Sequence, residues 1–283
     1  MQFTKMEGIG NDYIYINCFQ ETVDNPAALS VKMSQSHFGC GSDGLILILP
    51  SGRADFKMRM FNNDGSESEM CGNGIRCVAK YCYERGLTDQ REISIEAGGQ
   101  IKYVVCNVQN DVVSSVRVDM GVPVLNGVSI PSTIEGNPVM QHPLRAGGET
   151  YSVTLVNMGN PHAVIFVDDI HTAPVTTAGP LLESDSAFPE KANIEFVHVT
   201  DRTHAVMRVW ERGTGVTMAC GTGACAAAVA CVINGLTERT VDIALDGGTL
   251  RIEWSQADGH VYMTGPATFV YDGTWLQDIP ACP

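Results

Sequence analysis

One stretch decides how this chain is organised: MCGNGIRCVAKYCYERGLT at residues 70–88, which returns as ACGTGACAAAVACVINGLT at residues 219–237. Laid on each other without a gap, the copies share a cysteine and two glycines at the start and Gly-Leu-Thr at the end. Average amino-acid usage gives only about one or two coincidences in such a window, so chance does not explain the match. The offset of 149 residues points to a tandem duplication.

The same offset holds outside this stretch. The further matches are Gly10 and Asn11 with Gly159 and Asn160, Met58 and Arg59 with Met207 and Arg208, and Gly98 and Gly99 with Gly247 and Gly248. Two units are too few and too long for a solenoid. We therefore expect two similar domains related by a pseudo-twofold axis, with the functional site in the cleft between them.

The local patterns predict an α/β chain of the α+β type. Gly8 to Gly10 reads as a turn between two strands, residues 26–36 as a helix, and FKMRMF at residues 56–61 as a strand with one buried face. Residues 75–85 read as a helix that begins after the glycine-rich start and is capped by Gly86. Each domain is thus predicted to be a curved mixed sheet or barrel around a central helix.

The ends of the two repeats set the predicted domain boundaries. Residues 121–148 have no counterpart at the offset and read as a connection with a peripheral hairpin. A final strand, HVYMTGPATFVYDG at residues 260–273, resembles the one that closes the first repeat, and such end strands commonly complete the other lobe. We expect an N-terminal domain of residues 1–117 with 264–283 and a C-terminal domain of residues 118–263.

Composition excludes several classes of protein. With 283 residues, 44% hydrophobic and 18% charged, the chain has the composition of a soluble globular protein with room for two cores. Its net charge of -14 argues against nucleic acid and anionic membrane as partners, since both need basic patches. The N-terminus carries no apolar stretch of signal-peptide type, and the longest apolar run, around residues 224–233, is too short to span a membrane. We expect a cytoplasmic protein whose ten cysteines are reduced thiols.

The two glycine-opened helices carry the chemistry. A cysteine followed by Gly-x-Gly at a helix start, as at Cys71 and Cys220, lies where backbone N–H groups lack partners and the helix dipole favours a thiolate. The same N–H groups can hold a carboxylate. With both copies acting on one bound carboxylate, one cysteine removes the α-proton and the other returns one on the opposite face, which inverts the stereocentre.

The alternative is that these cysteines only pack and that the glycines only allow close approach of helix and strand. A matched pair in a duplicated chain favours the functional interpretation. Cys82 and Cys231 also match but lie in mid-helix, where a core role is expected, and Cys77 and Cys225 are expected to be structural as well.

Several further motifs accompany the cysteine pair. They are KMEGIGNDY at residues 5–13, FNNDGSE at 61–67, NPH at 160–162, NIEF at 193–196 and WERG at 210–213. With MCGNGIRC and ACGTGA, these resemble the diaminopimelate epimerase family over nearly the whole chain. The resemblance implies a cofactor-independent epimerase with two similar α/β domains, a homodimer, acting in lysine and peptidoglycan precursor synthesis. Proline racemase and hydroxyproline epimerase share that fold and its paired cysteines, and the phenazine-pathway isomerase shares the fold, but they lack this combination of motifs.

The resemblance also implies roles for individual residues. Cys71 is the proton donor and Cys220 the acceptor for conversion of L,L-diaminopimelate to the meso isomer, with His162 and Glu211 as auxiliary groups near the reacting centre. The residues implied to bind substrate are Asn11, Asn62, Gly72, Asn73, Asn160, Asn193, Glu211, Arg212, Gly221 and Thr222. Arg212 is the strongest of these on chemical grounds, because its guanidinium fork matches a carboxylate. Some relatives carry a substrate-contacting glutamine where this chain has Gly44, so that contact is either absent or supplied by a neighbour such as Ser42.

Two other functions compete with this reading. A racemase of proline or another cyclic amino acid would use the same cysteine pair, but it predicts an apolar pocket in place of the asparagines and Arg212. A metal-binding or metal-storage module would use the clustered cysteines, but no pair has zinc-site spacing.

Overall fold

The fold is that of a computed structural model, which describes residues 1–68 and 71–276. Met70, which opens the repeated stretch, and residues 277–283, which the predicted N-terminal domain includes, lie outside the described residues. The chain divides into two compact units, Met1–Val118 with the residues from Gly265 onward, and Asp119–Thr264.

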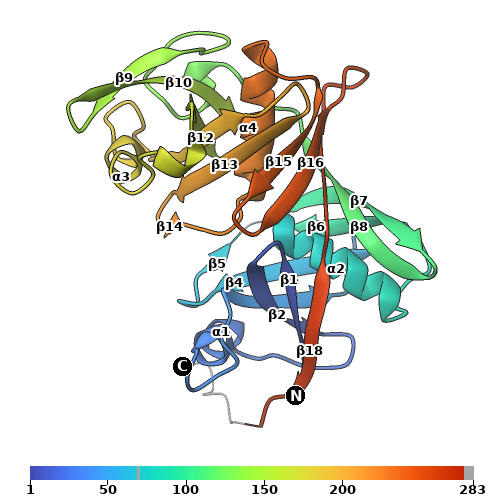
Figure 1. The fold of residues 1–283 in the computed structure, drawn as a ribbon. Helices are drawn as coiled ribbons and strands as arrows, with labels where there is room; N and C mark the ends of the chain where they lie inside the picture. The colour runs from blue at the N-terminus through green and yellow to red at the C-terminus, as the bar shows by residue number, and fades with distance from the viewer. Residues whose placement is uncertain (69–70, 277–283) are drawn as a thin grey trace. The chain divides into compact units, whose positions relative to one another are not determined.

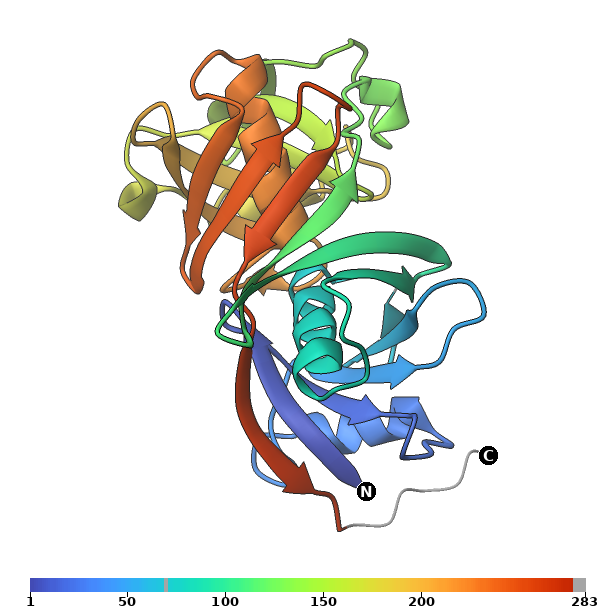
Figure 2. The same cartoon turned by 90° about the vertical axis from the view of Figure 1, so that its right-hand side faces the viewer.

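The first unit is a mixed sheet with two helices (Figure 1). Its elements are β1 (Gln2–Gly8), β2 (Asn11–Asn17), α1 (Pro26–Ser34), β3 (Gly44–Leu49), β4 (Phe56–Asn62), β5 (Glu67–Ser68), α2 (Gly72–Glu84), β6 (Glu92–Ala97), β7 (Gln100–Gln109), β8 (Val112–Gly121) and β18 (Thr268–Thr274). β2 pairs with β3 and β4 with β6 in parallel, while β1–β2, β3–β4, β6–β7 and β7–β8 are antiparallel. α2 packs against β1, β2 and β7 and runs along the inside of this curved sheet (Figure 2).

The second unit has the same plan. Its elements are η1 (Gly127–Ser129), β9 (His142–Ala146), β10 (Glu149–Asn157), β11 (Pro161–Phe166), η2 (Ile170–Thr172), α3 (Gly179–Glu183), β12 (Asn193–Val199), β13 (His204–Glu211), β14 (Gly215–Val216), α4 (Gly221–Ile233), β15 (Thr240–Leu245), β16 (Gly248–Trp254) and β17 (Val261–Gly265). β11 pairs with β12 and β13 with β15 in parallel, and β10–β11, β12–β13, β15–β16 and β16–β17 are antiparallel. α4 packs against β10 to β13, β15 and β16.

The order of parallel and antiparallel pairs is therefore identical in the two units, strand by strand at the 149-residue offset. β18 from the end of the chain pairs with β1, and β9 takes the corresponding place beside β10. The predicted mixed α+β fold is confirmed.

Two local predictions differ from the structure. α2 begins at Gly72, three residues before the predicted start, because the Cys71 side chain caps the helix and the glycines form its first turn. The single strand expected at residues 260–273 is two strands, β17 and β18, since Pro266 between them has no N–H to offer a ladder. The Pro266 carbonyl instead accepts a hydrogen bond from Arg76 Nε at 3.0 Å.

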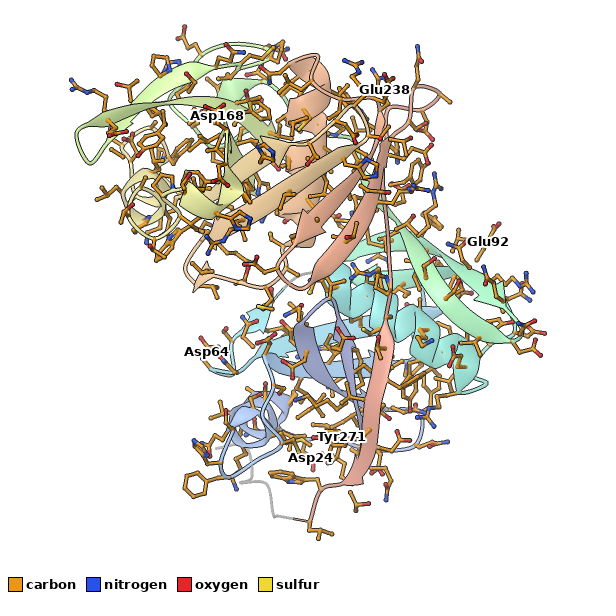
Figure 3. The ribbon with its side chains drawn as sticks, viewed as in Figure 1. Asp24, Asp64, Glu92, Asp168, Glu238 and Tyr271 are labelled. Atoms are coloured by element: carbon orange, nitrogen blue, oxygen red, sulfur yellow. The ribbon has the colours of Figure 1, made fainter. Side chains whose placement is uncertain are left out.

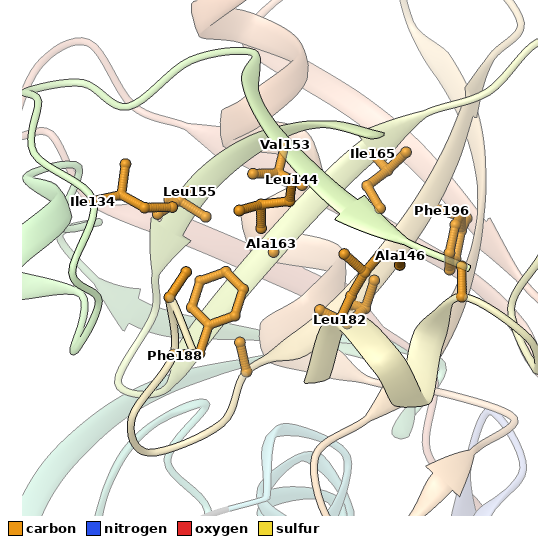
Figure 4. Close-up of a cluster of buried hydrophobic side chains, with 14 of the residues drawn as sticks. Ile134, Leu144, Ala146, Val153, Leu155, Ala163, Ile165, Leu182, Phe188 and Phe196 are labelled. Atoms are coloured by element: carbon orange, nitrogen blue, oxygen red, sulfur yellow. The ribbon is translucent and has the colours of Figure 1, made fainter. Parts of the chain in front are cut away.

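Each unit has an apolar core. In the second unit, β-strand side chains such as Val153, Leu155 and Ile165 pack with Leu182 of α3 and with Phe188 (Figure 4). In the first, Ile14, Ile16, Leu45 and Leu47 pack with Leu29 and Met33 of α1. None of the helices in the described ranges combines the length and the apolar character that a membrane crossing requires.

The acidic excess lies largely on the outside. Asp64, Glu92, Asp168 and Glu238 are exposed and point away from the ribbon (Figure 3). This placement is the physical reason for expecting repulsion of polyanions, because exposed carboxylates set the sign of the surface potential.

Candidate active site

The two cysteines occupy equivalent places at the starts of α2 and α4. Cys71 has φ -128° and ψ 118°, and Cys220 has φ -126° and ψ 108°, both extended backbone. Cys71 Sγ accepts a hydrogen bond from Gly74 N at 3.3 Å, and Cys220 Sγ accepts one from Gly223 N at 3.3 Å. Both thiols are thus N-caps, which places them beside the positive end of a helix dipole.

Cys71 is hydrogen-bonded to a polar side chain of its own unit. Cys71 Sγ lies 3.1 Å from Asn11 Oδ1, and Asn73 Nδ2 donates to the same oxygen at 3.4 Å. Asn11 Nδ2 in turn donates to Asp43 Oδ2 at 2.6 Å. Because a carboxylate only accepts hydrogen bonds, Asp43 fixes the orientation of the amide and turns Asn11 Oδ1 toward the sulfur. An oxygen acceptor at that position favours the protonated thiol.

Asn11 owes its position to a tight turn between β1 and β2. Ile9 has φ 52° and Gly10 φ 84°, so both residues of the turn are left-handed, as two-residue hairpins require. A β-branched residue in this region is strained. The predicted glycine turn is therefore present. Its other residue, Ile9, is held in this conformation by the burial of its side chain.

Asn62 and Gly44 lie side by side on paired strands. The Gly44 and Asn62 Cα atoms are register partners, and Asn62 Nδ2 donates to Ser66 Oγ at 3.0 Å. A Cβ at Gly44 would lie 2.1 Å from Phe61 O, so the backbone approach leaves no room for a side chain. Ser42 Oγ donates to Gly44 O at 3.0 Å and lies 3.1 Å from Ser34 Oγ. The Ser42 hydroxyl is therefore hydrogen-bonded within the segment from Ser34 to Gly44.

Cys220 is buried, with 4% of its surface exposed. Burial raises its pKa well above the usual value for a thiol, and the nearby carboxylates of Glu211 and Glu195 raise it further. The hydrogen bonds from Thr222 and from Gly223 N act in the opposite direction without cancelling this. The expectation that the helix N-terminus makes Cys220 a thiolate is therefore wrong for the resting protein, because desolvation of the charge outweighs the helix end.

His162 lies in the same unit, fully buried on β11. His162 Nδ1 is 2.6 Å from Glu195 Oε1, and His162 Nε2 is 2.9 Å from Asn160 Oδ1. Both side chains of the His162–Glu195 pair have 0% exposure. Asn160, predicted to bind substrate, thus also holds the imidazole.

Asn193, Glu211 and Arg212 lie where β12 and β13 pair. Asn193 Nδ2 donates to Pro161 O at 2.9 Å, and Asn193 Oδ1 accepts from Arg212 N at 2.9 Å. The buried amide therefore positions the backbone that carries Arg212, whose own side chain is exposed and donates to Glu190 O at 3.2 Å. Glu211 Oε2 accepts from Thr217 Oγ1 at 2.8 Å.

Three acidic residues around these groups escaped the sequence reasoning. Asp43 orients Asn11, Glu195 pairs with His162, and Glu183 accepts hydrogen bonds from Trp210 Nε1 at 2.8 Å and from Gly213 N at 3.0 Å. A signal for two of them was available. The 149-residue offset sets Asp43 against Ala192 and Glu195 against Ile46, so an acid in one copy faces an apolar residue in the other.

The remaining helix cysteines are core residues. Cys77, Cys82, Cys225 and Cys231 are all fully buried. Burial raises the pKa of the Cys77 and Cys231 thiols to about 12, so neither is a candidate nucleophile or base. Of the predicted residues, the structure thus brings together Cys71, Asn11 and Asn73 in one unit, and Asn160 with His162 and Asn193 with Arg212 in the other.

The sequence matches a family described as diaminopimelate epimerase over residues 3–126 and 154–270. Among curated proteins, the diaminopimelate epimerase of Acetivibrio thermocellus is 53% identical over 273 residues, covering 96% of this chain and 98% of the relative. The diaminopimelate epimerase of Methanococcus maripaludis is 50% identical over 273 residues, covering 96% and 99%.

Solved structures with the same fold are far more distant in sequence. A phenazine biosynthesis protein of the PhzF family from Bacillus anthracis superposes with a TM-score of 0.71 at 14% identity, covering 98% of this chain and 99% of that one. A probable proline racemase from Agrobacterium radiobacter, with bound carbonate, superposes with a TM-score of 0.72 at 12% identity, covering 98% and 93%. At this identity the likeness concerns the fold alone.

Proposed function

Because the chain belongs to the diaminopimelate epimerase family, we propose that it interconverts L,L- and meso-diaminopimelate by proton transfer between two cysteines, without a cofactor. The observation that supports this most directly is the matched pair of N-cap cysteines, each bonded to the second glycine of its Gly-x-Gly at 3.3 Å. The reaction is a step toward lysine and peptidoglycan precursors.

In the L,L-to-meso direction, Cys220 removes the α-proton and Cys71 delivers one on the other face of the same carbon. Cys71 suits the donor role, since its neighbour Asn11 Oδ1 accepts a hydrogen bond from a thiol. Burial raises the pKa of Cys220, so the cycle includes loss of its proton before it acts as a base. The direction reverses with the two roles exchanged.

The backbone N–H groups at the starts of α2 and α4 stabilise the charge that develops on the substrate carboxylate as the C–H bond breaks. These groups belong to Gly72, Asn73, Gly221 and Thr222. Their alignment with the helix dipole makes each helix start a site for an anion.

The distal amino-acid end of the substrate carries a second carboxylate and a second ammonium group. We assign its recognition to Arg212, whose guanidinium is exposed and can take a carboxylate on two N–H groups, and to the amides of Asn11, Asn62, Asn160 and Asn193. Since Asn193 holds the Arg212 backbone and Asn160 holds His162, these two asparagines also position other groups. His162 and Glu211 complete the set as auxiliary groups, with Glu211 close enough to Cys220 to influence its ionisation.

An isotope experiment tests the mechanism. With L,L-diaminopimelate in D2O, early product should carry deuterium at the inverted α-carbon while unreacted substrate stays largely protiated, because Cys71 delivers a hydrogen already exchanged with solvent. The distal centre should stay unlabelled. Substantial retention of the original hydrogen in early product would mean that one base serves both faces. Turnover of proline without turnover of diaminopimelate would contradict the substrate assignment.

We extend the proposal to a cytoplasmic homodimer. The dimer follows from the family resemblance, and light scattering on the purified protein tests it. The cytoplasm is supported by the thiols, since all nine cysteines of the described residues are free and reducing compartments keep them so.

A further inference from the structure

Arg76 is a charged residue in the interior of the first unit. It is the fifth residue of α2, the helix that Cys71 caps, and its exposed fraction is 0%. A guanidinium stays protonated in a folded protein, so this helix holds a buried positive charge close to its start. The 149-residue offset sets Cys225 of α4 against Arg76, and α4 contains no charged residue. The charge therefore belongs to one copy of the duplicated helix.

A buried cation at this position is costly for the fold. The start of a helix carries the positive end of its dipole, so a positive charge placed there is unfavourable. Removing a charged group from water is a second cost, and apolar side chains of similar volume often stabilise a protein equally well or better. Stability alone does not account for Arg76, which points to a task at the start of α2.

The guanidinium is enclosed by three segments of backbone. Arg76 Nη1 donates to Gly72 O at 3.2 Å, and Arg76 Nε donates to Pro266 O at 3.0 Å, in the segment between β17 and β18. The end of β1 forms the third side, because a Cβ at Gly8 would lie 3.0 Å from Arg76 Nη2 and 3.2 Å from Asn73 O. The positive charge thus lies against the carbonyl groups of the first turn of α2.

The hydrogen bond to Gly72 O acts on a group that the proposed mechanism uses. The carbonyl of Gly72 and the N–H of Asn73 belong to one planar peptide, and in a trans peptide they point in opposite directions. A guanidinium that holds the carbonyl therefore also fixes the direction of the Asn73 N–H, one of the proposed donors to the substrate carboxylate. A bond from a charged donor also polarises the peptide, which makes that N–H a stronger donor.

We propose that Arg76 is a positioning residue for the substrate carboxylate: through the Gly72–Asn73 peptide it directs and polarises the Asn73 N–H, and its charge adds to the positive end of the α2 dipole. This deepens the proposed function, because it rests on the carboxylate lying at the start of α2. At the equivalent position α4 has the neutral Cys225. The two helix starts match in their cysteines and glycines but differ in how strongly they attract an anion.

The test uses pimelate, which has the carbon chain and both carboxylates of diaminopimelate but no ammonium group. Pimelate has no stereocentre, so it can bind without being epimerised. Its dissociation constant is measured by titrating ¹⁵N-labelled protein and following the Gly72 and Asn73 amide signals. Arg76→Met keeps an unbranched side chain but removes the charge and the donors. We expect it to weaken pimelate binding roughly tenfold or more, because a charge in the interior is poorly screened.

Two further variants separate charge from volume. Arg76→Lys keeps the charge and a donor for Gly72 O, so it should recover most of the affinity that Arg76→Met loses. It should also return the ¹³C shift of the Gly72 carbonyl, which reports the hydrogen bond that this oxygen accepts, toward the wild-type value. Arg76→Gln is neutral but polar, and it replaces Arg76→Met in the comparison if the methionine variant does not fold; the same loss of affinity is expected.

Lys80→Met is the matched control, since it removes a second buried cation from the same helix. Lys80 Nζ donates to Glu84 Oε1 at 2.8 Å and to Val113 O at 2.7 Å, away from the helix start. This variant should lower the unfolding midpoint and leave the affinity for pimelate unchanged. A role of Arg76 in folding alone would give the same pattern as this control.

Two results would overturn the proposal. One is wild-type affinity for pimelate in a folded Arg76→Met or Arg76→Gln protein. The other is a wild-type protein in which pimelate leaves the Gly72 and Asn73 amide signals unshifted. Neither measurement involves turnover. A wild-type protein that binds pimelate as expected but does not epimerise diaminopimelate would count against the proposed function and leave the role of Arg76 standing.

Discussion

Glu183 anchors the loop that carries Arg212, and replacing it by glutamine should loosen that loop. The buried carboxylate accepts hydrogen bonds from Trp210 Nε1 at 2.8 Å and from Gly213 N at 3.0 Å, and Lys191 Nζ lies at 3.4 Å. Trp210 and Gly213 flank Arg212 on either side. A glutamine keeps one acceptor oxygen, so one N–H group of the three loses its partner.

The expected magnitude follows from that lost partner. Hydrogen bonds to charged groups contribute about 1.5–3 kcal/mol each, and a buried donor left unsatisfied costs about 1–3 kcal/mol. We therefore expect Glu183→Gln to lower the free energy of unfolding by about 2 kcal/mol. Activity should fall through a higher KM for diaminopimelate more than through a lower kcat, because Arg212 is proposed to bind the distal end of the substrate and does not touch the reacting carbon.

The effect also has a pH dependence. Burial alone would raise the pKa of Glu183, but the hydrogen bonds from Trp210, Gly213 N and Lys191 lower it below the ordinary value. A pKa lowered in the folded state means that the stabilisation is present above the unfolded pKa and is lost as the pH falls through the folded value. The stability difference between wild type and Glu183→Gln should therefore shrink toward acid pH.

Urea unfolding and steady-state kinetics measure both effects. Glu238→Gln is the matched control: it removes a carboxylate of the same unit that pairs with Arg202 at 2.9 Å but is about 60% exposed. Exposed pairs contribute about 0–1 kcal/mol, so its stability and KM should stay close to wild type. A Glu183→Gln protein that unfolds like the control, or one that loses kcat at unchanged KM, would refute the anchoring role.

Three further predictions concern the cysteines and their surroundings. Cys71→Ala and Cys220→Ala should each abolish epimerisation in a folded protein, whereas Cys82→Ala should cost about 1 kcal/mol of stability and spare activity; equal losses in all three, at equal stability, would contradict the role assignment. Gly44→Ala should lower stability by about 1–3 kcal/mol because its Cβ would lie 2.1 Å from Phe61 O, while Gly52→Ala, with nothing within 4 Å, should not. Asp43→Ala should free the Asn11 amide to turn its NH2 group toward Cys71 and speed alkylation of that thiol by iodoacetamide about three- to tenfold, with an unchanged rate counting against the orienting role.

The duplication made much of this fold predictable. An ungapped offset relates β1–β8 and α2 of one unit to β10–β17 and α4 of the other, so the turn at Gly8, the hairpin at Gly98 and the capped helix at Cys71 each predict a counterpart. The start of the helix was not predictable from composition alone, since three residues with two glycines look unfavourable for a helix until the cysteine side chain is seen to cap them. Pro266, by contrast, is visible in the sequence as a strand breaker, and β17 ends just before it.

The site was predictable in its shared residues and less so in those that differ between the copies. Cys71 and Cys220 can be identified from the sequence because they occupy equivalent positions in the two copies. Asp43, Glu183 and Glu195 instead act through tertiary contacts, which no residue spacing in the sequence reveals. The ionisation of Cys220 could not be inferred from its helix either. The helix end lowers the pKa of Cys220, whereas burial of the thiol and the carboxylates of Glu211 and Glu195 raise it, and only the three-dimensional arrangement shows which effect prevails.

These unequal surroundings bear on how a reversible epimerase uses two equivalent thiols. Each cysteine must be the acid in one direction and the base in the other, so neither environment can fix a role permanently. What the surroundings can set is which protonation state the free protein adopts. Asn11 Oδ1 accepts a hydrogen bond from Cys71 and favours its thiol form, while burial and the nearby carboxylates of Glu211 and Glu195 raise the pKa of Cys220. In the proposed mechanism, the protein receives the L,L isomer once Cys220 has lost its proton, and turnover itself produces the opposite state, which receives the meso isomer.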